Sequence, residues 1–205
     1  MTIDLFRSQA EKILNPVALI LKRKSVSANN LSLISLFFAM SAAATFYYSK
    51  SNHNYLLLAG LLVLLSSFTD ALDGTLARIT CTTCLRGDFL DHVIDRYCDT
   101  FILCAIFFAG YVSGEIGVIA ITGVLLTSYL GTQAQAVKLG RYYGGILGRA
   151  DRLVLIILAS VATAFYSQEI FYYSILGWSI VIIAVTSHIT AIQRIHHIWH
   201  KLKKS

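Results

Sequence analysis

The sequence has few charged residues. Only 14% of its 205 residues are Asp, Glu, Lys or Arg, whereas ordinary soluble domains contain about 25%. Hydrophobic residues make up 56% of the chain, and its mean hydropathy is +0.66. A soluble fold of this length cannot bury so much apolar surface, but lipid solvates the exterior of a membrane protein. The composition therefore excludes an ordinary soluble domain and predicts an integral membrane protein.

Proline is almost absent, since the chain has one proline beside 13 glycines, and this excludes a loop-rich or β-rich fold. The four cysteines lie in or beside apolar segments and do not resemble the framework of a secreted disulfide protein. Residues 1–10 are mixed polar and lack the layout of a signal peptide. A single C-x2-C pair, Cys81 and Cys84, has no evident partner pair and does not by itself predict a zinc site.

Six apolar stretches are each long enough to cross a hydrocarbon core of about 30 Å. They cover residues 31–48, 55–78, 89–112, 116–137, 153–166 and 170–192. Apolar residues at helical spacing over about 3–22 predict an amphipathic surface helix before them, with Pro16 interrupting its stripe. We expect an all-α membrane protein with one domain, 1–205. Its parts are a surface helix (1–24), a six-helix transmembrane bundle (31–192) and a basic tail (193–205).

The net charge of +6 is distributed unevenly among the connections. The loops 49–54, 113–114 and 167–169 contain one basic residue, Lys50, whereas the other connections and the chain ends are strongly basic. The positive-inside rule therefore places both termini in the cytoplasm and the protein in the cytoplasmic membrane. Because the basic residues flank apolar segments, we expect membrane lipid rather than nucleic acid as their partner.

Four aspartates flank one predicted cytoplasmic connection. Asp70 and Asp73 are three residues apart on one predicted helix, and Asp91 and Asp95 are four apart on the next. Each pair shares a helix face, so packing the two helices as a hairpin brings four carboxylates together. Such a cluster is tolerable when cations neutralise it, and oxygen ligands select Mg²⁺ or Mn²⁺. The spacing predicts a site for two divalent cations that clamps a diphosphate.

The flanking residues fit a phosphate-bearing ligand. Arg78 lies one helical turn beyond Asp73 and can neutralise phosphate. Gly74, Ala77 and Gly87 lack bulky side chains, so a base or ribose can approach the helix backbone closely. One intramembrane aspartate alone would equally fit a satisfied core polar group or a helix end near water. Four aspartates at these spacings favour a functional site.

The string D-x2-D-G-x2-A-R-x8-G-x3-D-x3-D, which spans residues 70–95, resembles the signature of the CDP-alcohol phosphotransferase family at all eight fixed positions. The layout of a surface helix and six transmembrane helices is also similar to that family. The segment 26–33, which contains Asn29, resembles the family's entry to the first transmembrane helix, with Ala28 in place of the usual proline. The resemblance implies phospholipid synthesis: a diacyl or archaeal ether CDP-lipid donates its phosphatidyl-type group to a polar alcohol, and CMP leaves.

The resemblance also implies residue roles. Asp95 would be the catalytic base, and two divalent cations would be bound by Asp70, Asp73, Asp91 and Asp95. The CDP-lipid would be held by Asn29, Gly74, Ala77, Arg78, Cys84 and Gly87. We also expect Asn29 to cap its helix, and Asp88 to cap the start of the third transmembrane helix. Homodimerisation is typical of the family, so a homodimer is expected.

A second cluster bears on the acceptor. The basic residues Lys138, Arg141, Arg149 and Arg152 lie on or beside the connection after the fourth transmembrane helix. These residues fit either a positive-inside loop or a pocket for a phosphorylated acceptor. In the second case, Asp151 would orient one of the arginines. The segment 148–152 resembles that of family members that use inositol phosphate, but those members also carry Lys and Arg in the fourth helix. Here that helix has Gly131, Gln133 and Gln135, so inositol phosphate and glycerol phosphate remain equal choices.

Two alternatives stay open. The acceptor could be an unphosphorylated alcohol such as serine or inositol. From another class, a small cation transporter would also place carboxylates inside the membrane. The four aspartates gather at one boundary rather than along a path, and this favours the enzyme.

Overall fold

The computed structural model describes residues 7–82 and 84–203. Within this part of the chain lie seven helices: α1 (Arg7–Arg23), α2 (Ala28–Tyr48), α3 (Asn54–Thr80), α4 (Leu85–Phe108), α5 (Gly114–Ala136), α6 (Arg149–Phe165) and α7 (Ile175–Leu202). The described residues form no strand beyond one isolated bridge between Ile170 and Tyr173. The predicted all-helical class is confirmed.

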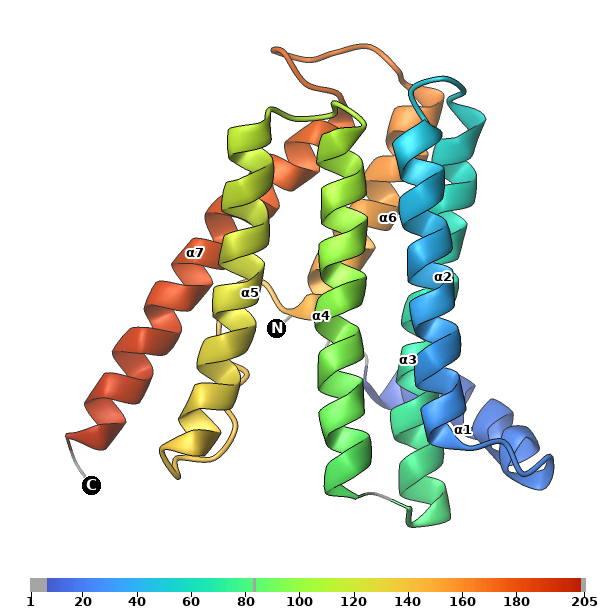
Figure 1. Cartoon of the computed structure of the whole chain (residues 1–205), viewed down its shortest axis with the longest axis vertical. Helices are drawn as coiled ribbons and strands as arrows, with labels where there is room; N and C mark the ends of the chain where they lie inside the picture. The colour runs from blue at the N-terminus through green and yellow to red at the C-terminus, as the bar shows by residue number, and fades with distance from the viewer. Residues whose placement is uncertain (1–6, 83, 204–205) are drawn as a thin grey trace.

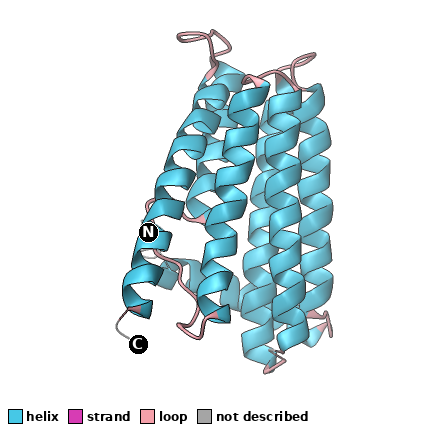
Figure 2. Cartoon of the chain, turned by 60° about the vertical axis from the view of Figure 1, so that its left-hand side comes forward, coloured by secondary structure: helices cyan, strands magenta, loops and turns pink. Residues whose placement is uncertain are grey.

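Helices α2 to α7 run side by side along the long axis, and α1 lies across one end of the bundle (Figure 1). That end, drawn lowest in Figure 1, also carries the 81–84 connection, the start of the 137–148 connection and the C-terminus of α7. The connections 49–53, 109–113 and 166–174 lie at the opposite end. Figure 2 shows the same upright arrangement from the side. The fold thus separates the charge-rich connections from the charge-poor ones.

Helix boundaries agree with the predicted ones to within a few residues for α2, α3, α4 and α5. Two differences affect the later chain. Helix α7 begins at Ile175 rather than near 170, because Ser174 caps it by accepting a hydrogen bond from the Gly177 backbone N–H. The helix then continues to Leu202 through most of the predicted basic tail. Helix α1 continues through Pro16 to Arg23, so the proline does not end it. Residues 1–6 of the predicted surface helix lie outside the described residues.

Four of these helices, α2, α3, α5 and α7, are long and apolar enough to cross a membrane. The helices α4 and α6 do not meet that description. The charged side chains of α4 are Arg86, Asp88, Asp91, Asp95, Arg96 and Asp99, and α6 has only 17 residues. Six membrane spans therefore remain a prediction.

Small residues allow the helices to approach closely, as is usual between membrane helices. Ala39 and Ala59 are fully buried between α2 and its neighbours, and the Ser66 hydroxyl of α3 donates to the Ser35 carbonyl of α2 at 2.8 Å. Large apolar side chains point outward along the candidate spans, among them Phe37, Leu61, Leu126 and Ile192. An apolar exterior around a packed interior is the pattern expected of a protein surrounded by lipid.

Candidate active site

Helices α3 and α4 both pack mainly against α2 rather than closely against each other, so the predicted hairpin is more open than expected. Their lower halves face each other across the space that holds the aspartates. Asp70 and Asp73 come from α3, and Asp91 and Asp95 come from α4. The short 81–84 connection joins the two helices at the lower end. The arrangement leaves room for a ligand between the two pairs of carboxylates.

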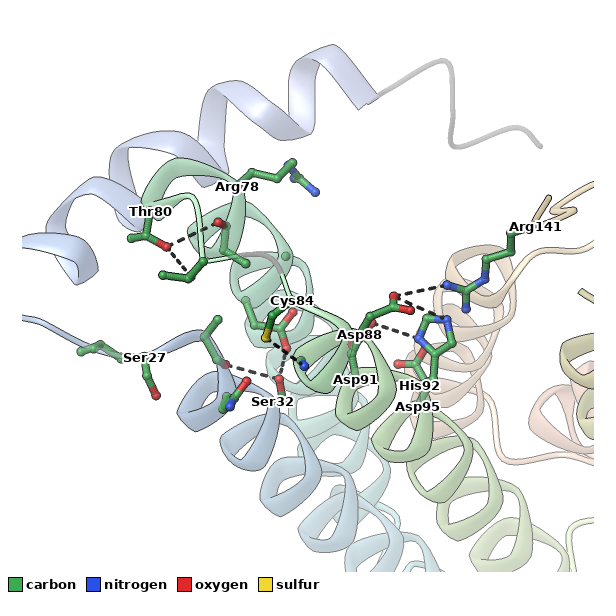
Figure 3. Close-up of a pocket in the computed structure, with 18 of the residues that line it drawn as sticks. Ser27, Ser32, Arg78, Thr80, Cys84, Asp88, Asp91, His92, Asp95 and Arg141 are labelled. Atoms are coloured by element: carbon green, nitrogen blue, oxygen red, sulfur yellow. Dashed lines mark hydrogen bonds and ion pairs between the residues drawn. The ribbon is translucent and has the colours of Figure 1, made fainter. Parts of the chain in front are cut away.

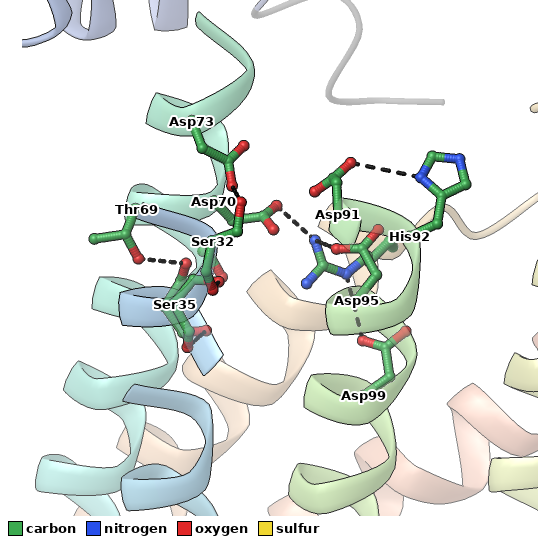
Figure 4. A network of polar contacts seen from close by, with 12 residues as sticks. Ser32, Ser35, Thr69, Asp70, Asp73, Asp91, His92, Asp95 and Asp99 are labelled. Atoms are coloured by element: carbon green, nitrogen blue, oxygen red, sulfur yellow. Dashed lines mark hydrogen bonds and ion pairs between the residues drawn. The ribbon is translucent and has the colours of Figure 1, made fainter. Parts of the chain in front are cut away.

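Three of the four carboxylates converge. One oxygen from each of Asp70, Asp91 and Asp95 lies within 4.8 Å of the other two, and Figure 4 shows these side chains turned toward one another. Asp70 Oδ1 is buried and has no hydrogen-bond partner among the described residues. A buried carboxylate oxygen with free lone pairs is costly unless a ligand satisfies it. This all-oxygen donor set therefore fits a hard divalent cation such as Mg²⁺ or Mn²⁺.

Asp73 stands at the edge of this cluster. Its Oδ2 accepts a hydrogen bond of 2.6 Å from the Ser32 hydroxyl on α2, and its side chain is buried. Ser32 thereby fixes the direction of the Asp73 carboxylate, as outer partners of metal-binding carboxylates commonly do. The structure gathers three of the predicted metal ligands directly and holds the fourth beside them through Ser32.

Arg149 supplies positive charge to the cluster from the start of α6. Its Nη1 lies 2.6 Å from Asp70 Oδ2 and 2.8 Å from Asp95 Oδ1, and its Nε lies 3.6 Å from Asp99 Oδ1. Arg152, one turn later, is buried and donates to Asp99 Oδ2 at 2.8 Å. The two arginines share a face of α6, as predicted, and that face meets the acidic face of α4.

A cavity of about 690 Å³ is lined mainly by residues of α2, α3 and α4 and of the connections next to them (Figure 3). Its lining includes all the residues expected to hold the CDP moiety: Asn29, Gly74, Ala77, Arg78, Cys84 and Gly87. A Cβ atom added at Gly74 would contact Arg78, and one added at Gly87 would contact Cys84 and Asn29, each at no less than 3.6 Å, so both glycines border other residues of the same lining. Arg78 donates to the Thr75 hydroxyl at 3.0 Å, which aligns its guanidinium along α3. Asp73, Asp91 and Asp95 line the same cavity.

A second cavity of about 850 Å³ lies between α4, α5, α6 and α7. It shares Asp95, Arg141 and Tyr143 with the first cavity, so Asp95 stands where the two meet. Five guanidinium groups line it, those of Arg96, Arg141, Arg149, Arg152 and Arg194. Three carboxylates, those of Asp95, Asp99 and Asp151, line it as well, so positive charge is in excess and the lining suits an anion.

One predicted member of the basic cluster is not part of this lining. Lys138 lies outside both described cavities, because its backbone adopts the left-handed conformation (φ 63°) just after α5 ends. Arg141 does reach the cavities, where it lies 3.6 Å from Asp88 Oδ1 and over the Tyr143 ring.

Three predicted capping or orienting roles are wrong. Ser27, not Asn29, caps α2, and its hydroxyl accepts from the Asn30 backbone N–H. The sulfur of Cys84 caps α4, which leaves Asp88 free to contact His92 and Arg141. Asp151 does not orient an arginine, because it accepts from the Gly148 backbone N–H at the start of its own helix.

Sequence reasoning missed several residues of the two cavities. Ser32 lies one turn beyond Asn29, and its link to Asp73 required the packing of α2 on α3. Arg96 directly follows Asp95, donates to its Oδ2 at 3.0 Å and hydrogen-bonds the Ser128 hydroxyl of α5. Arg194 lay in the predicted basic tail, and only the continuation of α7 brings it to the second cavity.

The model of the CDP-alcohol phosphatidyltransferase family matches residues 25–189. The chain belongs to this family. It is therefore a transferase of phospholipid synthesis. Helices as apolar as α2 and α7 suit the membrane setting of that chemistry.

Individual relatives are similar along nearly the whole chain. An archaetidylinositol phosphate synthase of Pyrococcus horikoshii is 28% identical over 197 residues, covering 96% of each chain. A synthase of the same name from Methanothermobacter thermautotrophicus is 29% identical and covers 98% of this chain and 96% of its own.

A solved structure shares the fold. The phosphatidylinositol phosphate synthase of Mycobacterium tuberculosis with CDP-DAG bound has a TM-score of 0.76 at 24% identity, covering 92% of this chain and 94% of that one. The same protein in complex with manganese and citrate gives a TM-score of 0.75, again at 24% identity, over 91% and 88% of the two chains.

Proposed function

We propose that this enzyme moves a phosphatidyl-type group from a CDP-lipid to a hydroxyl of inositol phosphate, releasing CMP. The observation that carries the proposal is the position of Asp95 between a cavity lined by the predicted CDP-binding residues and a cavity lined by five arginines. A phosphorylated acceptor matches the excess of positive charge in the second cavity. The names of the relatives favour inositol phosphate over glycerol phosphate.

On the donor side, the first cavity receives the nucleotide. Gly74 and Gly87 line this cavity on α3 and α4 without a side chain of their own, so the base and ribose can approach the helix backbone there, and Arg78 stands where it can neutralise phosphate. Ala77, Asn29 and Cys84 complete the walls of the cavity. The lipid chains, diacyl or archaeal ether, remain outside in the bilayer.

Asp70, Asp73, Asp91 and Asp95 would hold two divalent cations, Mg²⁺ or Mn²⁺. When bound, the cations neutralise charge on the diphosphate of the donor. The buried Oδ1 atom of Asp70, which has no hydrogen-bond partner among the described residues, and the converging oxygens of Asp91 and Asp95 support this assignment. The manganese complex of the Mycobacterium tuberculosis protein is in keeping with it.

Asp95 acts as the general base. Because it borders both cavities, it can take a proton from an acceptor hydroxyl that faces the donor phosphate. The hydroxyl oxygen forms a bond to the lipid-side phosphorus, the bond from that phosphorus to the CMP oxygen breaks, and CMP leaves. Positioning and charge neutralisation account for most of the rate of such transfers.

The acceptor phosphate binds among Arg141, Arg149, Arg152 and their neighbours in the second cavity. We call residues 137–148, which carry Arg141 and Tyr143 into this cavity, the acceptor loop. Lys138, which lies outside the cavities, contributes only to the positive field at its entrance.

The distribution of basic residues supports a membrane arrangement as well. We propose one domain with six spans, α2 to α7, and with α1 on the cytoplasmic surface. Both termini and the active site face the cytoplasm, because the end of the bundle near the aspartates carries most of the Lys and Arg residues of the connections. Two copies form a homodimer, as is typical of the family that the sequence resembles.

CMP release tests the reaction. The purified enzyme in detergent with Mg²⁺ is given a CDP-lipid and inositol phosphate, glycerol phosphate, serine or inositol. We expect CMP with inositol phosphate. No CMP with any of these acceptors would refute the enzyme, and cation flux in vesicles would then support the transporter alternative.

A further inference from the structure

The acceptor loop lies along one face of α7. Thr190, Arg194 and His197 are spaced four and three residues apart, so they share that face. The Tyr142 ring stacks on the His197 ring at 4.0 Å with an interplanar angle of 8°. The Leu147 backbone N–H donates to the Thr190 hydroxyl at 3.4 Å. Contacts from successive turns of α7 therefore hold the second half of the loop, at residues 142, 144 and 147.

Arg194 is the central contact, and both of its bonded nitrogens face backbone carbonyls. Its Nε donates to the Gly144 carbonyl of the loop at 2.8 Å, and its Nη1 donates to the Thr127 carbonyl of α5 at 2.5 Å. The side chain is buried, with 7% of its surface exposed. The planar guanidinium of one α7 residue thus links the loop to α5 through two hydrogen bonds. A lysine ammonium group, which is flexible and not planar, would hold both carbonyls less well.

Gly131 makes room for this arrangement. A Cβ atom at position 131 would lie 2.8 Å from Arg194 Nη1 and 3.0 Å from the Tyr142 carbonyl. The Tyr142 backbone N–H also donates to the Gly131 carbonyl at 3.4 Å. The absence of a side chain on α5 here lets the guanidinium and the loop backbone pass close to the helix.

We propose that Arg194 is a positioning residue that clamps the acceptor loop, with Gly131 as the gap that admits the clamp. The clamp holds Arg141 and Tyr143 at the boundary shared by the two cavities. This inference rests on the proposed function, since it assigns the clamped loop to acceptor binding. Its consequence is a selective one: loosening the clamp weakens acceptor binding and leaves the CDP-lipid cavity intact.

Two measurements on the full-length enzyme in detergent test the clamp. Hydrogen exchange reports the order of peptides that cover 137–148, and steady-state kinetics report the KM of each substrate. The variants are Arg194→Met, which removes the guanidinium, Arg194→Lys, which keeps the charge, and Gly131→Ala, which fills the gap. The controls are Gln193→Ala on the exposed side of α7 and Gly114→Ala, where an added Cβ meets nothing within 4 Å.

The clamp predicts that Arg194→Met speeds exchange in the loop and raises the acceptor KM, each by at least about tenfold, because hydrogen bonds from a charged donor are lost. Gly131→Ala and Arg194→Lys shift both readouts in the same direction. Exchange in α2 and α3 and the CDP-lipid KM stay at wild-type values, and both controls match wild type.

Each other outcome is decisive. Unchanged loop exchange in Arg194→Met overturns the clamp, whatever reaction the enzyme performs. Wild-type behaviour of Arg194→Lys shows that only the charge is needed and also overturns it. Faster loop exchange with equal changes in both KM values, or with none, overturns the assignment of the clamped loop to the acceptor. Failure of the proposed function appears separately, as absence of CMP release from the wild-type enzyme.

Discussion

The Arg149 guanidinium, on the first turn of α6, lies 2.6 Å from the Asp70 carboxylate on α3. These two residues are 79 positions apart in the sequence, and their contact joins the acidic cluster to the arginine-lined cavity. The same Nη1 atom lies 2.8 Å from Asp95, the proposed base. Arg149 therefore lines the arginine-lined cavity and balances charge of the acidic cluster at its edge, and the first prediction concerns its part in the cavity.

Replacing Arg149 by Ala removes a cation that lines only the arginine-rich cavity. We expect the acceptor KM to rise at least about tenfold, since hydrogen bonds to a charged group are worth about 1.5–3 kcal/mol. The CDP-lipid KM should change by less than about twofold, because Arg149 does not line the cavity assigned to the nucleotide and loses no hydrogen bond to it. Steady-state kinetics with each substrate varied in turn check this. Arg86→Ala, exposed and outside both cavities, is the control. Equal rises in the two KM values would contradict the acceptor assignment.

Asp95→Asn keeps the size of the side chain but removes the proton acceptor. We expect turnover to fall by at least about a hundredfold, the lower range for loss of a general base. Binding of CDP-lipid, measured by its protection of the enzyme against thermal unfolding, should be largely retained. If binding is lost together with turnover, Asp95 is chiefly a structural metal ligand.

Ser32→Ala removes the hydrogen bond that directs Asp73. Loss of such an outer partner typically weakens metal binding about 10- to 100-fold, and we expect a shift of at least about tenfold in the Mn²⁺ concentration needed for half-saturation. Electron paramagnetic resonance of free Mn²⁺ measures this without turnover. Ser41→Ala, whose hydroxyl bonds only to the Phe37 carbonyl of its own helix, is the matched control. Identical Mn²⁺ binding in both variants would remove Ser32 from the site.

Arg152 and Asp99 form a buried pair at the base of the second cavity. Removing one partner leaves a buried charge, so Arg152→Leu should lower the free energy of unfolding by about 3 kcal/mol. Replacing both residues in Arg152→Leu with Asp99→Leu should recover most of that loss. Denaturant unfolding in detergent measures both variants. If the double variant is no more stable than Arg152→Leu, the negative charge of Asp99 does not cause the loss of stability in Arg152→Leu.

The helices were predictable because their apolar lengths and charged ends are local properties of the sequence. Sequence spacing also predicted that each pair of aspartates, Asp70 with Asp73 and Asp91 with Asp95, shares a helix face. Three of these carboxylates, those of Asp70, Asp91 and Asp95, do converge. What local reasoning lacked was the packing partner. Helix α2 packs against both α3 and α4, and this packing places the Ser32 hydroxyl where it donates a hydrogen bond to the Asp73 carboxylate.

The arginine-lined cavity was harder to predict for a similar reason. Helical spacing relates only Arg149 and Arg152, whereas the other three arginines come from α4, the acceptor loop and α7. Arg194 fell in a region predicted as a basic tail, because His and Lys residues there concealed the continuation of α7. Lys138 was predicted to join the cluster on charge alone, whereas the turn after α5 directs it elsewhere.

Product analysis by mass spectrometry tests the central claim most directly. The enzyme is incubated with Mg²⁺, a CDP-lipid and an equimolar mixture of inositol phosphate, glycerol phosphate, serine and inositol. The account predicts a lipid whose headgroup is inositol phosphate as the main product, formed with one CMP for each molecule. A product that contains only serine or unphosphorylated inositol would contradict the assignment of the arginine-lined cavity to an acceptor phosphate.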